Sequence, residues 1–356
     1  MRRARESESL TVYDGDLSGC GVPSPFDPDQ VMAATRLETW VACPHRYFQQ
    51  YLLRVPEPED HDQQLRINAL DRGNLLHTTI DRFLRTVLDG ELPTPSPHEP
   101  WTIEHHRAAL SILDDESERA RRSGLTGREE LWVRDHAHLR RELCTWLLVD
   151  DAERAAAGFV PVASERSFGT ANADWPAAVV TTDDGRTVRF RGSIDRLDVT
   201  ADGSVVVTDH KTGSTRKFED IDKRPFAGGS KLQLATYAAA VAQHDGRPSP
   251  VGVTARYAFT RTNKRIGYTV TEEIWGEFRE LLGVIGTSIE AGLFPARPEP
   301  PGFQLWVDCP YCDPDGLGTG EAHRRWRTKQ ADPRLRPYLR MIGELDEPEA
   351  APEVTA

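Results

Sequence analysis

The sequence predicts an α/β protein in which helices flank a central mixed sheet that includes an antiparallel meander. Three observations support this prediction: apolar residues recur at helical spacing before residue 157, the period changes to that of strands near residue 177, and helices and strands alternate after residue 230. The chain has 356 residues, of which 38% are hydrophobic. A chain of this length and composition can bury a large core.

The N-terminal part is expected to be helical after an irregular arm. Residues 1–30 carry glycines, prolines and charges without an apolar period, which predicts an arm without regular structure. A helix is expected near residues 34–54, with a bend or break at Pro44. Residues 56–62 are an acidic linker. Further helices with apolar residues at helical spacing are expected at residues 67–88, 103–122 and 128–156.

The middle of the chain is expected to form strands. The meander consists of residues 177–182, 187–199 and 204–210. Tight-turn signals, Asp184-Gly185 and Asp202-Gly203, separate these strands. The later elements are a helix over residues 232–242, strands over 251–260 and 267–270, and a helix over 272–291.

These elements indicate three parts of the chain. An irregular arm occupies residues 1–30, one domain occupies residues 31–330, and a basic and then acidic tail occupies residues 331–356. The acidic part, from about Gly343, is expected to be disordered.

Charge and hydropathy narrow the function classes. A formal net charge of -12 argues against coating of nucleic acid through a general positive field, but it allows a local basic groove. No apolar run is long enough for a membrane span, and the charged N-terminus has no apolar segment of a secretory signal. We therefore expect a cytoplasmic protein. The sequence has no G-x-x-x-x-G-K-[ST] motif, so the chain is not expected to be an ATP-driven motor by itself.

Two segments place acidic and basic side chains at the end of an expected hairpin. They are Gly192-Ser-Ile-Asp195-Arg-Leu-Asp198 and Val205-Val-Val-Thr-Asp209-His-Lys211. Because strand residues two apart project to one face, Asp209 and Lys211 share a face with Val205 and Val207. Asp195 lies on the preceding strand and is close enough to approach the same point. Two carboxylates and a lysine are costly to bury without a purpose, and Mg²⁺ or Mn²⁺ would relieve the carboxylate repulsion.

This pair of segments resembles the PD-(D/E)xK nuclease superfamily in its RecB-like branch, which carries G-x-[IV]-D-R-x-D on one strand and D-x-K on the next. The resemblance covers about residues 31–330 and implies a restriction-endonuclease-like core. It implies that Asp195 and Asp209 hold Mg²⁺ or Mn²⁺, together with the backbone carbonyl of His210. Lys211 would orient or deprotonate the attacking water, or offset developing charge on the phosphate.

The resemblance extends to both sides of the hairpin. Gly73-Asn-Leu-Leu-His77 matches a helical G-x-x-x-H motif whose histidine supplies a further metal ligand, and the spacing puts both ends on one helical face. Gln233-Leu-Ala-Thr-Tyr237 matches a Q-x-x-x-Y motif. Its two polar side chains would contact DNA phosphate or orient the catalytic groups. Glu165 lies where many relatives carry an acidic residue before the meander.

The cysteines give a second candidate metal site. Thr35-Arg-Leu-Glu-Thr-Trp-Val-Ala-Cys43-Pro-His-Arg-Tyr-Phe resembles the segment that opens the nuclease domain in helicase–nucleases of the AddB and RecB type. In iron–sulfur members, this cysteine joins a CxxC pair and one further cysteine around a [4Fe–4S] cluster. Cys309 and Cys312 match the pair, but Gly318 stands where the fourth cysteine is expected.

Three alternatives therefore remain for Cys43, Cys309 and Cys312. They hold an iron–sulfur cluster completed by another ligand such as His323 or Asp313, they hold Zn²⁺, or they pack without metal. In each case the expected role is structural, because it ties two distant parts of the chain together.

A basic segment near the C-terminus is a candidate DNA contact. Trp326 and Tyr338 interleave with seven basic residues: Arg324, Arg325, Arg327, Lys329, Arg334, Arg336 and Arg340. Such a mixture suits backbone contact and base stacking, and a solvated helix end is the alternative.

The function that the resemblance implies is metal-dependent hydrolysis of DNA phosphodiester bonds in repair or recombination, as an exonuclease. A helicase or ATPase partner is expected, because the chain lacks a nucleotide-binding motif of its own. Tyr13-Asp-Gly-Asp-Leu resembles the linker before the nuclease domain of fused helicase–nucleases, which indicates a detached nuclease module. One alternative is a DNA-binding or scaffold subunit that no longer cuts. Another is a metal-sensing or redox protein built around the cysteines.

Overall fold

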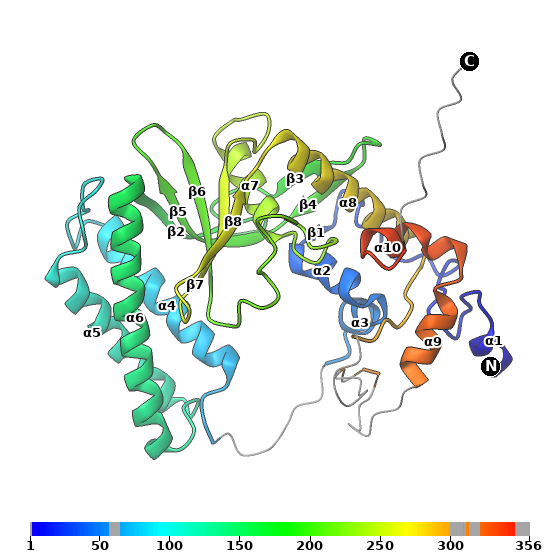
Figure 1. Cartoon of the computed structure of the whole chain (residues 1–356), viewed down its shortest axis with the longest axis horizontal. Helices are drawn as coiled ribbons and strands as arrows, with labels where there is room; N and C mark the ends of the chain where they lie inside the picture. The colour runs from blue at the N-terminus through cyan, green and yellow to red at the C-terminus, as the bar shows by residue number, and fades with distance from the viewer. Residues whose placement is uncertain (1, 57–64, 300–308, 310, 313–320, 346–356) are drawn as a thin grey trace.

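A five-stranded sheet lies at the centre of the molecule (Figure 1). The computed structural model describes residues 2–56, 65–299, 309, 311–312 and 321–345. In spatial order the strands are β2 (Val160–Phe168), β5 (Gly192–Val199), β6 (Val205–Lys211), β7 (Thr254–Phe259) and β8 (Arg265–Thr269). Only β6 and β7 pair in parallel within this sheet, and the other pairs are antiparallel. The predicted central mixed sheet is therefore confirmed.

The central strand β6 is buried along almost its whole length. It begins with three consecutive valines, and only its last residue, Lys211, is more than slightly exposed. A continuous β-branched run is typical of a strand that is covered on both faces. The parallel pairing of β6 with β7 requires a crossover, which contains α7 (Gln233–His244).

The structure corrects the predicted meander. The segment expected as one strand over 187–199 is two strands, β4 (Thr187–Phe190) and β5, which belong to different sheets. β4 lies between β3 (Ala178–Thr181) and β1 (Val31–Met32) in a separate three-stranded sheet. The short β1 and the nine-residue β2 were not predicted. Both strands pair with residues that are far away in the chain, and the local pattern of apolar residues does not reveal such pairings.

Three helices form a lobe beside the sheet, drawn in cyan and green in Figure 1. They are α4 (Ala69–Leu88), α5 (Ile103–Arg122) and α6 (Glu129–Ala157). They share an apolar cluster that is separate from the main core. The Asn68 side chain caps α4 by accepting the backbone N–H of Asp71, and Gly158, at φ 68°, ends α6.

The first long helix breaks at Pro44, as predicted from the sequence. α2 (Ala34–Ala42) ends before Cys43, whose backbone is extended, and α3 (Pro44–Tyr47) begins with the proline. A turn of π-helix, Phe48–Leu52, follows. α8 (Glu272–Glu290) agrees closely with the predicted 272–291.

The N-terminal arm packs against the C-terminal helices. It contains one short helix, α1 (Arg2–Glu6), which was not predicted, and its Asp16 pairs with Leu293 after α8. Lys329 in α9 (Glu321–Lys329) is buried and forms an ion pair with Asp14 at 2.9 Å. Arg334, in the turn between α9 and α10 (Arg336–Met341), pairs with Asp16. Two of the seven basic residues that were candidate DNA contacts, Lys329 and Arg334, therefore hold the arm in place.

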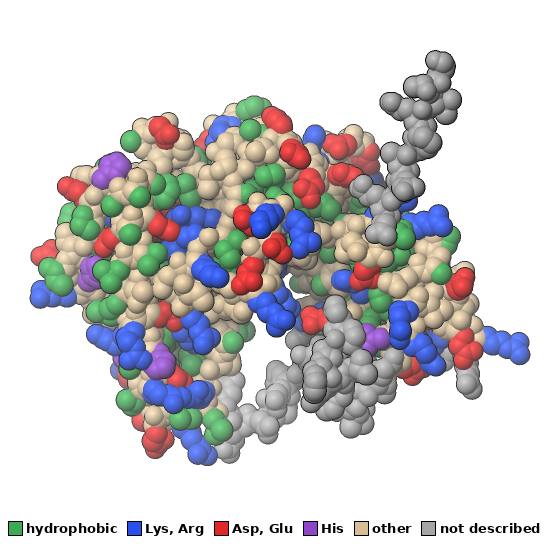
Figure 2. All heavy atoms as spheres, viewed as in Figure 1, with side chains coloured by type: hydrophobic (Ala, Val, Ile, Leu, Met, Phe, Trp, Pro, Cys, Tyr) green, Lys and Arg blue, Asp and Glu red, His purple; other side chains and the backbone are tan. Residues whose placement is uncertain are grey.

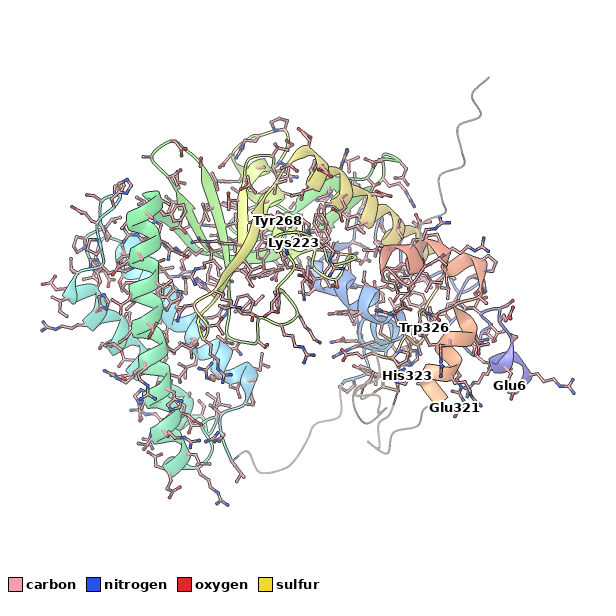
Figure 3. All side chains as sticks on the ribbon, in the orientation of Figure 1. Glu6, Lys223, Tyr268, Glu321, His323 and Trp326 are labelled. Atoms are coloured by element: carbon pink, nitrogen blue, oxygen red, sulfur yellow. The ribbon has the colours of Figure 1, made fainter. Side chains whose placement is uncertain are left out.

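The two aromatic residues of the basic segment are also structural. Trp326 and Tyr338 are buried, at 6% and 1% exposure, and the Tyr338 hydroxyl donates to the backbone oxygen of Val41. Figure 3 shows Trp326 on α9, near Glu321 and His323. Buried rings cannot stack on bases, so the predicted stacking role of these two residues is wrong.

No helix in the described part of the chain has the length and hydropathy of a membrane span. Residues 57–62 of the expected acidic linker, Asp313, Gly318 and the chain after residue 345 lie outside the described residues.

Candidate metal centre and active site

The end of the β5–β6 hairpin carries the residues that the sequence singled out. Asp195 and Asp209 lie on adjacent antiparallel strands, one residue beyond the paired Arg196 and Thr208. α4 brings His77 to the same point, so that its Nδ1 atom lies 3.4 Å from Asp195 Oδ2. A cavity of about 570 Å³ opens here, and its lining includes His77, Glu165 and Lys211.

Three donor atoms at the end of the hairpin suit one metal ion. His77, Glu165 and Asp195 each offer a ligand atom, and these atoms lie within 4.8 Å of one another. Donors that share one hard cation at about 2.1–2.6 Å lie within about 4–5 Å of one another. Among the described residues, this is the one set of three or more His, Cys, Asp or Glu side chains with that spacing.

Glu165 belongs to this cluster, although sequence reasoning assigned it no role as a metal ligand. It lies on β2, between residues that pair with Arg196 and Ile194, so it stands beside Asp195 across the two strands. Its backbone has φ 45°, which is unusual for a residue with a side chain inside a strand. Ser193 Oγ donates to Glu165 Oε2 at 2.7 Å. The signal in the sequence was an acidic residue just before the expected meander.

Crowding of carboxylates gives the cluster its electrostatic character. Burial raises the pKa of Asp195 well above its usual value, and the neighbouring charges of Asp209 and Glu165 raise it further. The backbone N–H of His210 donates to Asp195 Oδ2 at 2.7 Å and partly offsets this effect. Burial lowers the pKa of His77, which favours the neutral imidazole that binds metals. The donor set therefore fits a divalent cation.

Asp209 and Lys211 form a second part of the site. Their side chains share one strand face, as predicted, and Lys211 Nζ lies 2.6 Å from Asp209 Oδ2. Burial by itself lowers the pKa of Lys211, but Asp209 outweighs it, so the pKa lies above the ordinary value. A lysine that stays protonated orients water or offsets phosphate charge, and it does not accept a proton.

Helix α7 fixes the position of this lysine. Lys211 Nζ donates to Gln233 Oε1 at 3.2 Å, and Gln233 Nε2 donates to the Tyr237 hydroxyl at 2.7 Å. Tyr237 is buried, and its ring packs against Phe168 and over Gly192, where an added Cβ would lie 3.0 Å from it. Of the two roles expected for the Q-x-x-x-Y motif, these contacts favour orientation of the catalytic groups.

The side chain of His210 is buried behind the three donors. It is 2% exposed, makes edge contacts with the rings of Trp146 and His77, and has its Nδ1 atom 3.8 Å from Asp195 Oδ2. Burial lowers the pKa of His210 well below the usual value, which favours the neutral imidazole.

Gly73 lets α4 approach the end of β6. An added Cβ at this position would lie 3.1 Å from Thr212 Oγ1, which is closer than a relaxed contact. The glycine of the G-x-x-x-H motif therefore allows the close approach that brings His77 to the hairpin, as expected.

Glu38 is a residue of the site region that the sequence did not reveal. It lies on α2, and its Oε1 atom accepts the backbone N–H groups of Leu232 and Gln233 at 2.6 and 3.1 Å. These groups are at the start of α7, which has no side-chain cap from its own N-cap residue. Glu38 therefore caps the helix that positions Lys211.

We expect Glu38→Ala to lower the free energy of unfolding by about 1–2 kcal/mol, because two backbone N–H groups lose their acceptor. Urea denaturation measures this loss. Glu38→Gln is the matched control, since it keeps an acceptor oxygen and is expected to retain most of the stability. Equal stability of Glu38→Ala and wild type would show that the cap is unimportant.

The second candidate metal site consists of Cys43, between α2 and α3, and the pair Cys309 and Cys312. Burial raises the pKa of Cys43, and Cys309 contributes to this increase. A hydrogen bond with Cys312 lowers the pKa of Cys309 to about 6. In the described residues these thiols do not form a three-donor cluster of metal-binding spacing. Their binding of iron–sulfur or zinc stays a prediction.

The mixed sheet and its donor cluster define a restriction-endonuclease-like α/β protein with a candidate divalent-metal centre. The family model of the PD-(D/E)XK nuclease superfamily matches residues 31–316, and the chain belongs to this superfamily.

Curated relatives carry the same region within much longer chains. The chain is similar to an ATP-dependent helicase/deoxyribonuclease subunit of Acetivibrio thermocellus, with 28% identity over 212 residues, which cover 58% of this chain and 17% of the relative. The protein of the same name from Clostridium acetobutylicum is 25% identical over 244 residues, covering 67% and 19%. That of Caldanaerobacter subterraneus is 24% identical over 254 residues, covering 68% and 21%. The chain thus spans about a fifth of these relatives.

Proposed function

We propose that the chain is a divalent-metal-dependent deoxyribonuclease, acting as an exonuclease in cytoplasmic DNA repair or recombination with a helicase partner. The observation that carries this proposal is that two groups lie next to each other at the end of the β5–β6 hairpin: the donors His77, Glu165 and Asp195, and the pair Asp209–Lys211. The names of the relatives support DNA as the substrate and a helicase as the partner.

The residues divide the chemistry between them. His77, Glu165 and Asp195 would hold Mg²⁺ or Mn²⁺, with Asp209 and the His210 carbonyl as the further ligands implied by the family resemblance. The ion would supply Lewis acidity toward the phosphate and a lower pKa for bound water. Lys211, charged and held between Asp209 and Gln233, would orient the attacking water and offset charge that develops on the phosphate.

We expect end-labelled linear DNA to be cut with Mn²⁺ or Mg²⁺ and to stay intact with EDTA. Lys211→Met is expected to lower the cleavage rate by about 10²–10³-fold, because it removes the charge that faces the transition state. The product ladder shows the polarity and whether cutting starts at ends. A wild-type protein that binds DNA but does not cut it with either Mg²⁺ or Mn²⁺ would instead support the scaffold alternative, or the need for a helicase partner.

The cysteine site is a separate part of the proposal. The pair Cys309–Cys312 together with Cys43 holds an iron–sulfur cluster or Zn²⁺, or it packs without metal. Iron and zinc analysis of anaerobically purified protein separates these three outcomes.

A further inference from the structure

A basic groove lies along α6, although the whole chain is strongly acidic. The groove has a volume of about 670 Å³, and Arg66, Arg72, Arg134, His138, Arg141 and Arg261 are among its lining residues. Two acidic residues, Asp135 and Glu142, also line it, so positive charge exceeds negative charge. Figure 2 shows Lys and Arg side chains over this lobe, beside the hollow beneath the sheet. We name this feature the α6 groove.

The α6 groove is continuous with the cavity of the metal cluster. Ala69 at the start of α4 and the turn Thr212–Gly213 after β6 line both. Lys211 therefore lies directly before the turn that separates the two. From Arg134 to Thr145, the lining residues of α6 extend over about 16 Å at the rise of an α-helix. This length is that of several phosphate spacings along a DNA strand.

Some arginines of the groove form ion pairs within the protein, and others do not. Arg72 is paired with Glu142, and Arg66 lies 3.7 Å from Asp135. Arg141 on α6 and Arg261 after β7 have neither an ion pair nor a side-chain hydrogen bond to any of the described residues. Both side chains are exposed. These two charges are free for an anionic partner.

We propose that the α6 groove binds the phosphate backbone of the DNA strand that is being cut, with Arg141 and Arg261 as direct phosphate contacts. This proposal rests on the proposed nuclease function and adds the path by which the strand reaches the metal cluster. Arginine suits this role because its guanidinium binds phosphate through two parallel hydrogen bonds. The local excess of positive charge explains how an acidic chain can hold a polyanion.

The test is DNA binding, measured without cutting. Fluorescence anisotropy in EDTA gives the dissociation constant of a labelled single-stranded oligonucleotide over a range of salt concentrations. We expect Arg141→Gln/Arg261→Gln to weaken binding by about 10-fold or more near 0.1 M salt. The slope of log affinity against log salt should fall in magnitude by about 1.4, because two phosphate contacts are lost.

Arg107→Gln is the matched control. Arg107 is an exposed arginine on α5 that does not line the α6 groove, and it has no ion pair with the described residues. Its substitution should leave the affinity and the salt slope unchanged. Circular dichroism and thermal unfolding establish that all variants are folded.

A second measurement separates this proposal from the nuclease function. Bis(p-nitrophenyl) phosphate is a small phosphodiester. Its hydrolysis needs the metal cluster, but the molecule is too short to reach the α6 groove. The double variant should therefore hydrolyse it at the wild-type rate. If the wild type hydrolyses neither DNA nor this diester but the double variant still loses DNA affinity, the nuclease proposal fails and the groove proposal stands. If affinity and salt slope match the wild type, the groove proposal is overturned.

Discussion

Asp195→Asn is expected to lower DNA cleavage by at least about 10³-fold, with either Mg²⁺ or Mn²⁺. Asp195 connects the two parts of the site: it belongs to the three-donor cluster, and it lies on the strand beside Asp209. Asparagine keeps the shape and the acceptor for the His210 N–H group, but it removes the charge that a cation needs. We expect calorimetric titration with Mn²⁺ to show at least about a tenfold weaker affinity.

The same substitution should not destabilise the metal-free protein. Its neutral side chain removes the repulsion from Asp209 and Glu165, so the midpoint of thermal unfolding in EDTA should be equal to or higher than that of the wild type. Asp245→Asn, an exposed carboxylate at the end of α7, is the matched control and should change neither cleavage nor metal affinity. Cleavage within tenfold of wild type would contradict the assignment of Asp195.

Arg196→Met is expected to reduce the free energy of unfolding by about 3–5 kcal/mol. Arg196 lies in the same motif as Asp195, but its side chain points to the opposite face of β5 and is 2% exposed. It forms ion pairs with Asp150 of α6 at 2.7 Å and with Asp198 at 2.8 Å. Burial lowers the pKa of this arginine, but the two carboxylates outweigh it and keep the guanidinium charged. Its removal leaves two buried carboxylates without the ion-pair partner that they share.

Urea denaturation measures this effect. Arg166→Met is the control, because Arg166 forms an exposed pair with Asp174 and its loss should cost less than about 1 kcal/mol. Adding Asp198→Asn to Arg196→Met should recover part of the stability, since it removes one of the two buried carboxylates that lost their ion-pair partner. A loss below about 1 kcal/mol for Arg196→Met would show that this network does not hold the helical lobe to the sheet.

Much of the site could be predicted because strand and helix periods are local rules. Alternation along a strand placed Asp209 and Lys211 on one face, and the helical repeat placed Gln233 beside Tyr237. The break at Pro44 also followed from one residue, because proline has no N–H group to continue a helix.

Other features depended on contacts between distant parts of the chain. Glu165 joined the metal cluster only because β2 pairs with β5, and Glu38 became a helix cap only because α2 packs against the start of α7. The basic C-terminal segment, a candidate DNA contact in the sequence, proved to hold the N-terminal arm through Lys329 and Arg334.

The sequence by itself determined the strand and helix periods, the family motifs and the order of the acidic residues. The tertiary structure alone decided which carboxylates meet in one cluster, which arginines of the described residues stay unpaired, and where β4 separates from β5. The physical reason is that periodicity reports which face of an element is apolar, whereas charge pairing depends on which elements meet. The residue type alone does not distinguish Arg196 from Arg141. In the structure Arg196 forms a buried ion pair with Asp150, whereas Arg141 lines the α6 groove without an ion pair to the described residues.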